Sequence, residues 1–219
     1  MNIQHLSKKG RELLKMYSQM VDEGYERVSG EQIQDVFSDF ESRHFKEQIL
    51  NTFREYKIKS VLDYGCGGSD WYLKGFDQKS NKSAVQYYSL DYAKRYEPSR
   101  KIDDRQLKCA DCVMCFDVLE HVFVTDVPNV LRDIFKNAKK LVILNVACYP
   151  AAAKLPNGEN AHITLRPPLW WKGAVDSIAS EFDEITVHLG CSEKYKKVGF
   201  FAPFGKSLWE QSTTYVTKF

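Results

Sequence analysis

The segment from Lys57 to Gly68 constrains the fold of this chain more strongly than any other part of the sequence. A short apolar run ends at Tyr64 and leads directly into a loop that carries Gly65, Gly67 and Gly68. Strands buried in parallel sheets have such continuous apolar runs. Glycines in the following turn let backbone amides approach a ligand closely. The segment therefore predicts a first core strand followed by a ligand-binding turn.

Later apolar runs predict that this strand belongs to a parallel sheet. Further strands are expected over Tyr92–Pro98, Asp111–Phe116 and Lys140–Ala147. A helix is expected over Val127–Ala138, and Asp77–Ser83 is predicted to be a polar surface loop. Strands that alternate with helices indicate an α/β fold with right-handed crossovers. Three late segments are candidates for edge strands: Glu184–Leu189, Lys197–Phe201 and Thr213–Phe219.

The residues before the first strand have a helical pattern from His5 to about Tyr56. Apolar residues recur there at helical spacing. They are Leu13, Leu14, Tyr17 and Met20, followed by Val36, Phe37, Phe40, Phe45, Ile49 and Phe53. We expect residues 1–56 to form a helical segment that packs on a ligand-binding domain at residues 57–219. A chain of this length can bury one sizeable core, so the two parts are expected to make one structural domain.

The composition favours a small-molecule partner. The 31 basic and 29 acidic residues give a formal charge of +2, which is too balanced to indicate a nucleic-acid surface. No apolar run approaches the roughly 18 residues that span a bilayer. Met1 to Gly10 lacks the apolar stretch of a secretory signal. We therefore expect a cytoplasmic protein that has neither a membrane nor a nucleic acid as its partner.

The six cysteines are expected to be free thiols. Cys109, Cys112 and Cys115 have a spacing that invites a zinc or iron–sulfur interpretation. Cys112 and Cys115 fall within a predicted strand, however, where side chains three residues apart point to opposite faces. They cannot converge on one ion without breaking the sheet, so small buried thiols are the better interpretation.

Two motifs in the same order resemble those of class I S-adenosylmethionine-dependent methyltransferases. Val61 to Gly67 resembles the first motif of that family, and Asp111 to Val122 resembles its fourth-strand motif. The resemblance implies a Rossmann-like α/β fold with a mostly parallel seven-stranded sheet flanked by helices. It also implies an enzyme that uses S-adenosylmethionine and releases S-adenosylhomocysteine.

By the same resemblance, Asp63 would orient the methionine amino group of the cofactor. The loop residues that would line the cofactor are Gly65, Cys66 and Gly67. Ser69 takes the place of the family's usual third glycine. Asp70 stands where a dinucleotide fingerprint needs a glycine, and its charge is poorly placed for a pyrophosphate at a helix N-terminus. An acidic loop suits a cationic sulfonium ligand better.

The family also needs an acid at the end of the second strand, where a carboxylate accepts hydrogen bonds from both ribose hydroxyls. Asp91 and Glu97 are the two candidates. Glu97 is preferred, because Pro98 directly after it would stop a strand and start a turn. The short distance from Glu97 to Asp111 also resembles a subset of the family in which the third strand is abbreviated.

Asp117, Glu120 and His121 follow the strand at 111–116, where open α/β sheets bind ligands. Asp117 is expected to contact the cofactor, and both Asp117 and His121 are expected to be catalytic. The spacing resembles the acid-x-x-Glu-His arrangement that holds a divalent ion in some small-RNA and quinone-precursor O-methyltransferases. In many other relatives the Glu-His pair binds no metal, so a metal there, with His162 as a further ligand, is an alternative that the sequence does not favour.

The segment from Leu155 to Trp171 is predicted to line an acceptor pocket, because it combines turn residues, prolines and an aromatic pair. It resembles a loop of bacterial methyltransferases associated with surface-polysaccharide biosynthesis, which implies a hydroxyl of a sugar or sugar nucleotide as the acceptor. His162 is the candidate general base, and Asn145 is also expected to face the acceptor. For Trp170 and Trp171, packing of a following helix is favoured over ligand stacking.

Three other functions are weighed against a sugar methyltransferase. The first is a metal-dependent O-methyltransferase that acts on RNA or another small molecule. The second is a non-catalytic subunit that only binds the cofactor. The third is a nicotinamide oxidoreductase, which Asp70 disfavours.

Overall fold

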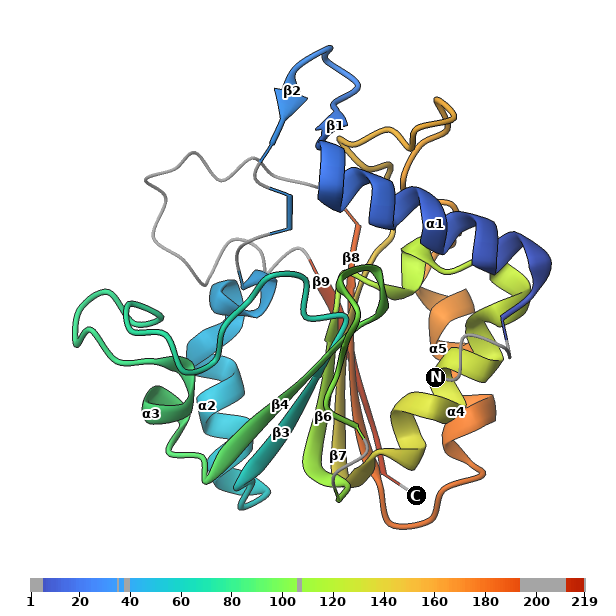
Figure 1. Ribbon diagram of the computed structural model, residues 1–219. Helices are drawn as coiled ribbons and strands as arrows, with labels where there is room; N and C mark the ends of the chain where they lie inside the picture. Colours follow the sequence, from blue (N-terminus) through green and yellow to red (C-terminus); the bar gives the residue numbers. More distant parts are fainter. Residues whose placement is uncertain (1–5, 35, 38–39, 106–107, 194–211, 219) are drawn as a thin grey trace.

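A seven-stranded sheet forms the centre of the molecule, with helices on both of its faces (Figure 1). The computed structural model describes residues 6–34, 36–37, 40–105, 108–193 and 212–218. Among these residues, no helix has the length and apolar character needed to cross a membrane. The predicted strand at Lys197–Phe201 lies outside the described residues.

Five parallel strands make up the middle of the sheet, and a short antiparallel strand closes each edge. The strand order is β5-β4-β3-β6-β7-β8-β9. The parallel strands are β3 (Ser60–Tyr64), β4 (Tyr92–Glu97), β6 (Ala110–Phe116), β7 (Ala138–Ala147) and β8 (Thr186–Ser192). The edge strands are β5 (Ile102–Asp103) and β9 (Ser212–Thr217). The mostly parallel sheet confirms the predicted fold class at the level of a Rossmann-like α/β architecture.

The order of the strands determines where a ligand can bind. The chain runs outward from β3 through β4 to β5, then returns to the other side of β3 and continues through β6 and β7. The two directions diverge between β3 and β6. Open α/β sheets bind ligands in the crevice beyond the carboxyl ends of the strands at such a switch point.

Side chains alternate between the two faces of the sheet and build two separate cores. On one face, Cys112 and Met114 pack against α2 (Lys46–Glu55) and α3 (Ala84–Tyr88). On the other face, Val113 and Cys115 pack against two further helices, α4 (Val127–Lys136) and α5 (Pro168–Ala179). Cys112 and Cys115 therefore point away from each other, and all six cysteines are free, as predicted.

The N-terminal residues are only partly helical, so the helical pattern predicted from His5 to about Tyr56 is confirmed only at α1 and α2. Helix α1 (Lys8–Glu23) ends where Gly24 adopts a left-handed conformation with φ of 83°. A hairpin of β1 (Tyr25–Glu26) and β2 (Gln32–Ile33) follows. Phe37, counted as helical by its spacing, has φ of 51°. Turn chemistry overrides the apolar spacing in this segment.

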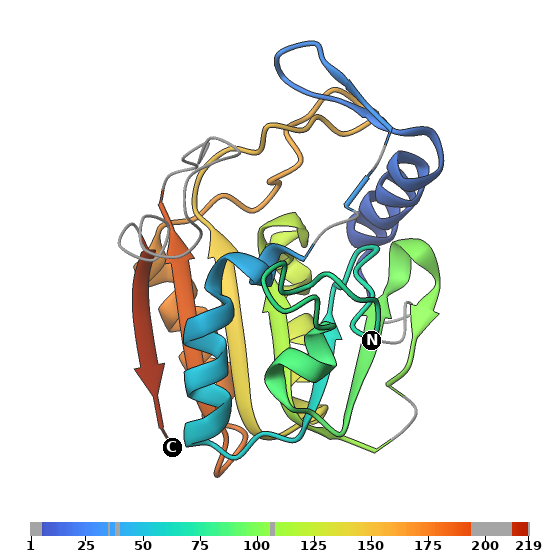
Figure 2. The ribbon, with the colours of Figure 1, turned by 90° about the vertical axis from the view of Figure 1, so that its left-hand side faces the viewer.

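Helix α1 and the hairpin lie beyond the carboxyl ends of the strands, while α2 packs against the face of the sheet (Figure 2). Ser7 caps α1 by accepting a hydrogen bond from the Gly10 amide, and it donates from its backbone and its hydroxyl to Asp126. Gly10 is required at this contact, since a Cβ there would lie 2.1 Å from an oxygen of Asp126. The start of α1 is thus fixed against the residue that precedes α4, a helix far from it in sequence.

The remaining predicted elements are confirmed with small changes in their bounds, except that Glu184–Leu189, expected as an edge strand, belongs to β8, which lies between β7 and β9. Strand β4 ends at Glu97, and Pro98 begins a short 3-10 turn, η3 (Pro98–Arg100). Strand β5 has two residues, which agrees with an abbreviated third strand. Residues 77–83 form a turn-rich loop, as the polar sequence indicates.

Candidate functional site

A cavity of about 540 Å³ opens at the carboxyl ends of β3, β4 and β6, beside the switch point of the sheet. This volume lies within the roughly 300–1,000 Å³ that is usual for small-molecule sites. Helix α1 and residues 149–153 complete its wall. Eight residues singled out in the sequence line it: Asp63, Gly65, Cys66, Gly67, Glu97, Asp117, His121 and His162.

The glycine loop packs tightly against its neighbours in the chain. Gly65 has φ of 81°, and a Cβ on it would lie 2.2 Å from Cγ2 of Val118. Gly67 has φ of 54°, and a Cβ on it would lie 2.5 Å from the carbonyl oxygen of Phe37. Both positions therefore need glycine for backbone conformation and for space.

Gly65→Ala is expected to lower the free energy of unfolding by roughly 2–4 kcal/mol, the combined cost of a left-handed alanine and of overpacking against Val118. Val118→Ala in the same chain should recover the overpacking part and leave the backbone part. Urea unfolding of the two single variants and the double variant measures both. If Gly65→Ala lowers the free energy of unfolding equally in the wild type and in the Val118→Ala background, the added Cβ does not overpack against Val118.

Asp63 lies at the end of β3 and is held from one side only. Its Oδ2 accepts hydrogen bonds from Trp71 Nε1 at 2.8 Å and from Ser69 Oγ at 3.0 Å. Burial raises the pKa of the Asp63 carboxyl to about 6, against the lowering effect of these two donors. Ser69 is thus a support for Asp63 and is itself buried.

The interpretation of Asp70 as part of the ligand loop is wrong. Asp70 is exposed, is not part of the cavity wall, and accepts a hydrogen bond from the amide of Tyr72. No helix begins directly after the glycine loop, since residues 66–83 form turns and bends and α3 starts only at Ala84. The described segment therefore lacks the helix N-terminus by which a dinucleotide fold binds a pyrophosphate.

The choice of Glu97 over Asp91 agrees with their positions on β4. Glu97 is the last residue of the strand and lines the cavity. Its Oε2 accepts a hydrogen bond from the Gly67 amide at 3.2 Å, and its Oε1 accepts two from Ser99. Asp91 precedes the strand at the opposite end of the sheet and is exposed. Glu97 connects the glycine loop to the turn that follows β4.

Asp117 follows β6 in a left-handed conformation with φ of 53°, which is uncommon for a residue other than glycine. Its Oδ1 accepts a hydrogen bond from Asn145 Nδ2 at 2.7 Å, and its amide donates to the Asn145 carbonyl. Burial raises the pKa of the Asp117 carboxyl. Asn145, expected at the acceptor, thus contacts Asp117 and is absent from the residues that line the cavity.

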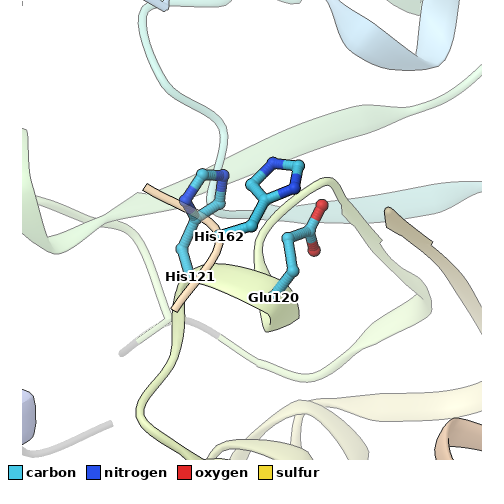
Figure 3. A group of neighbouring side chains, drawn as sticks. All are labelled: Glu120, His121 and His162. Carbon is cyan, nitrogen blue, oxygen red and sulfur yellow. The ribbon is translucent and has the colours of Figure 1, made fainter. Parts of the chain in front are cut away.

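Glu120, His121 and His162 come together beside the cavity (Figure 3). The first two belong to a 3-10 turn, η4 (Leu119–His121), and His162 comes from the loop before α5. Thr164 fixes this loop against the turn, because its amide donates to the Glu120 carbonyl and its hydroxyl donates to the Val122 carbonyl. The rings of His121 and His162 meet edge to face, with centroids 4.9 Å apart.

Tyr17 of α1 is part of the site, although the sequence indicated only an apolar helix position for it. Its hydroxyl donates to the Ala161 carbonyl at 2.7 Å and lies 2.9 Å from Nδ1 of His121. Nδ1 of His121 also lies 3.0 Å from the same carbonyl. Burial lowers the pKa of His121 to about 3 and also lowers the pKa of His162, so both rings are neutral at pH 7.

The predicted acceptor loop contributes less to the cavity than expected. Of residues 155–171, only His162 is among those that line the cavity, whereas Tyr149 and its neighbours before this segment form much of that wall. Trp170 and Trp171 belong to α5 and pack on the core, as favoured from the sequence. Neither tryptophan is among the residues that line the cavity, so the aromatic pair serves the packing of α5.

A scan of known protein-family models and a search of curated proteins find no match to this chain.

Proposed function

We propose that this protein is an S-adenosylmethionine-dependent methyltransferase that acts on a hydroxyl of a small molecule. The observation that carries the proposal is the set of three acidic side chains around the cavity at the switch point: Asp63, Glu97 and Asp117. Anionic walls favour a ligand with an ammonium and a sulfonium group and disfavour a pyrophosphate. The volume of the cavity and this set of acceptors suit such a cofactor.

Each acid would have a separate role in holding the cofactor. Asp63 is placed to accept from the ammonium group, since its two hydrogen bonds from the protein both go to Oδ2. Glu97 is placed for the ribose hydroxyls at the end of β4. The loop of Gly65, Cys66 and Gly67 would pack against the cofactor between them. When bound, the cofactor would supply an electrophilic methyl group on a positively charged sulfur.

The other side of the cavity would orient the acceptor and take its proton. Asp117 is a candidate base, because burial raises the pKa of its carboxyl and thereby strengthens it as a proton acceptor near neutral pH. His162 and His121 are unprotonated at neutral pH, although their lowered pKa values make them weaker bases. Most of the rate enhancement in such a transfer comes from positioning the two reactants in line. A sugar or sugar-nucleotide hydroxyl remains the acceptor predicted from the sequence.

Calorimetry with S-adenosylmethionine, S-adenosylhomocysteine and NAD⁺ tests the first part of this proposal. We expect both sulfur ligands to bind with one site per chain and NAD⁺ not to bind. Incubation with a metabolite extract should then release S-adenosylhomocysteine. Binding without any release would instead support a non-catalytic subunit, and binding of NAD⁺ alone would contradict the proposal. Release with RNA but with no small molecule would favour the RNA methyltransferase.

Glu97→Ala is expected to weaken S-adenosylmethionine binding roughly 10–100-fold, because it removes a charged hydrogen-bond acceptor. Asp91→Ala is the matched control, since it removes a carboxylate from the same strand's opposite end, and should leave the dissociation constant unchanged. Calorimetry of both folded variants measures the difference. A larger effect from Asp91→Ala would contradict the assignment of the ribose site.

A further inference from the structure

We propose that Glu120, His121 and His162 bind one divalent transition-metal ion. One ligand atom from each residue lies within 4.8 Å of the others. Zinc bonds of about 2.0–2.2 Å place neighbouring ligand atoms roughly 3.3 Å apart, so rotations of the side chains would bring the three onto one ion. The sequence did not favour a metal, because the Glu-His pair binds no metal in many similar proteins. The structure adds that His162 lies beside His121, which is 41 positions earlier.

The hydrogen bonds of the two imidazoles leave their Nε2 atoms as lone-pair donors to an ion. A carbonyl oxygen can only accept, so Nδ1 of His162 donates its proton to the Tyr149 carbonyl. The Tyr17 hydroxyl donates to the Ala161 carbonyl, so Nδ1 of His121 must donate to that carbonyl or to the tyrosine oxygen. In each neutral ring Nε2 is then unprotonated. Histidine ligands of metals almost always have this outer hydrogen bond to a carbonyl or a similar acceptor.

Glu120 supplies the second, independent observation. Its side chain is fully buried, and Oε1 accepts a hydrogen bond from the Ala147 amide at 3.0 Å. Its Oε2 is buried and has no hydrogen-bond partner among the described residues. A buried carboxylate oxygen without a partner is costly unless a cation or a proton accompanies it. A metal ion between this carboxylate and the two imidazoles would supply that partner.

The ligand set indicates which kind of ion is bound. Two imidazole nitrogens and one carboxylate suit zinc, iron, manganese and similar ions, whereas magnesium and calcium prefer oxygen ligands. Asp117, a ligand in the alternative considered from the sequence, is not in the cluster, and its Oδ1 already accepts from Asn145. The proposal thus differs from that alternative in its ligands, because it leaves out Asp117.

The position of the cluster gives the ion access to a substrate. His121 and His162 line the cavity, while Glu120 lies behind them. The remaining coordination positions would therefore face the cavity. The ion could take an oxygen of the acceptor as a further ligand and lower the pKa of its hydroxyl. Only this last role rests on the proposed methyl transfer, because the three ligands themselves bind no part of the cofactor.

The test is a titration of the full-length, chelator-treated protein with MnCl₂, followed by the electron paramagnetic resonance signal of free Mn²⁺, with ZnCl₂ as competitor. We expect one Mn²⁺ per chain, displaced by Zn²⁺. Glu120→Gln and His162→Gln should each weaken binding at least about 100-fold, since each removes a direct ligand, a larger change than the 10–100-fold of outer partners. His188→Gln, which alters a half-buried histidine on β8, is the matched control and should bind like the wild type.

Thermal unfolding with and without Zn²⁺ distinguishes a variant that no longer binds the ion from one that is only less stable. Zn²⁺ should raise the melting temperature of the wild type and of His188→Gln, but not that of Glu120→Gln. No binding by the folded wild type would overturn the proposal, as would binding that survives both ligand substitutions. Binding of S-adenosylmethionine, measured separately, tells failure of the metal site apart from failure of the methyltransferase proposal.

Discussion

Asp63→Asn is expected to weaken S-adenosylmethionine binding by roughly 100-fold or more, because the amide can neither attract nor fully pair with an ammonium group. The substitution preserves the size of the side chain. It also keeps an oxygen that can accept from Trp71 Nε1 and Ser69 Oγ, the two donors that hold Asp63. The structure of the loop should therefore survive while the cofactor site loses its charge.

The same substitution should make the protein more stable at pH 8. The pKa of Asp63 is raised to about 6 in the folded chain, above its ordinary value of 3.8. The folded state then holds this proton more tightly than the unfolded state, so the wild type loses stability as the pH rises from about 4 to 6. Asparagine has no such loss, and the expected gain at pH 8 is up to about 3 kcal/mol.

Urea unfolding of wild type and Asp63→Asn at pH 8 and near pH 4 measures this effect, and calorimetry at pH 8 measures binding. The gain in stability should be present at pH 8 and much smaller near pH 4, where Asp63 is protonated in the folded state and partly protonated in the unfolded state. A variant that is less stable at both pH values would mean that the hydrogen bonds outweigh the burial of the charge. Undiminished binding would remove Asp63 from the cofactor site.

Trp171→Ala is expected to lower the free energy of unfolding by about 3–5 kcal/mol, the usual cost of deleting a fully buried aromatic side chain. Trp171 packs in the core between α5 and the sheet and has no exposed surface. Its Nε1 has no hydrogen-bond partner among the described residues, so Trp171→Phe loses no such bond and should cost much less. Denaturant unfolding of the two variants gives the comparison.

Trp170→Ala is a useful control for the same measurement. Trp170 is only partly buried and contacts Trp171 edge to face, with ring centroids 4.9 Å apart. Its loss should be smaller than that of Trp171→Ala, and neither variant should change the affinity for S-adenosylmethionine while folded. Weaker cofactor binding by a folded Trp170→Ala protein would instead indicate that Trp170 stacks on a ligand.

The sequence predicted the sheet well because buried parallel strands leave a local pattern. The strands β3, β6 and β7 are mostly apolar, and β3 and β6 end directly before the glycine loop and Asp117. The site residues at the ends of β3, β4 and β6 could be predicted for the same reason. Parallel strands bring their carboxyl ends to one edge, so residues far apart in sequence become neighbours there.

Other parts of the site could not be predicted because they depend on contacts without any local signal. Tyr17 had only the spacing of an apolar helix residue, yet its hydroxyl contacts His121 and the Ala161 carbonyl. The apolar residues before β3 have helical spacing, so the sequence did not predict the hairpin of β1 and β2. Residues 155–171 were predicted to line the acceptor pocket because of their turn residues, prolines and tryptophans. Most of these residues form turns and the start of α5 instead.

The contacts of α1 have a consequence for how the protein forms during synthesis. This helix is synthesised before the sheet, but its partners Asp126 and Ala161 lie 119 residues beyond Ser7 and 144 residues beyond Tyr17. Docking such distant partners requires closure of a long loop of chain and is intrinsically slow. Helix α1 is therefore expected to be among the last elements to dock, and the nascent chain gains a closed cavity only after most of its sheet has been synthesised.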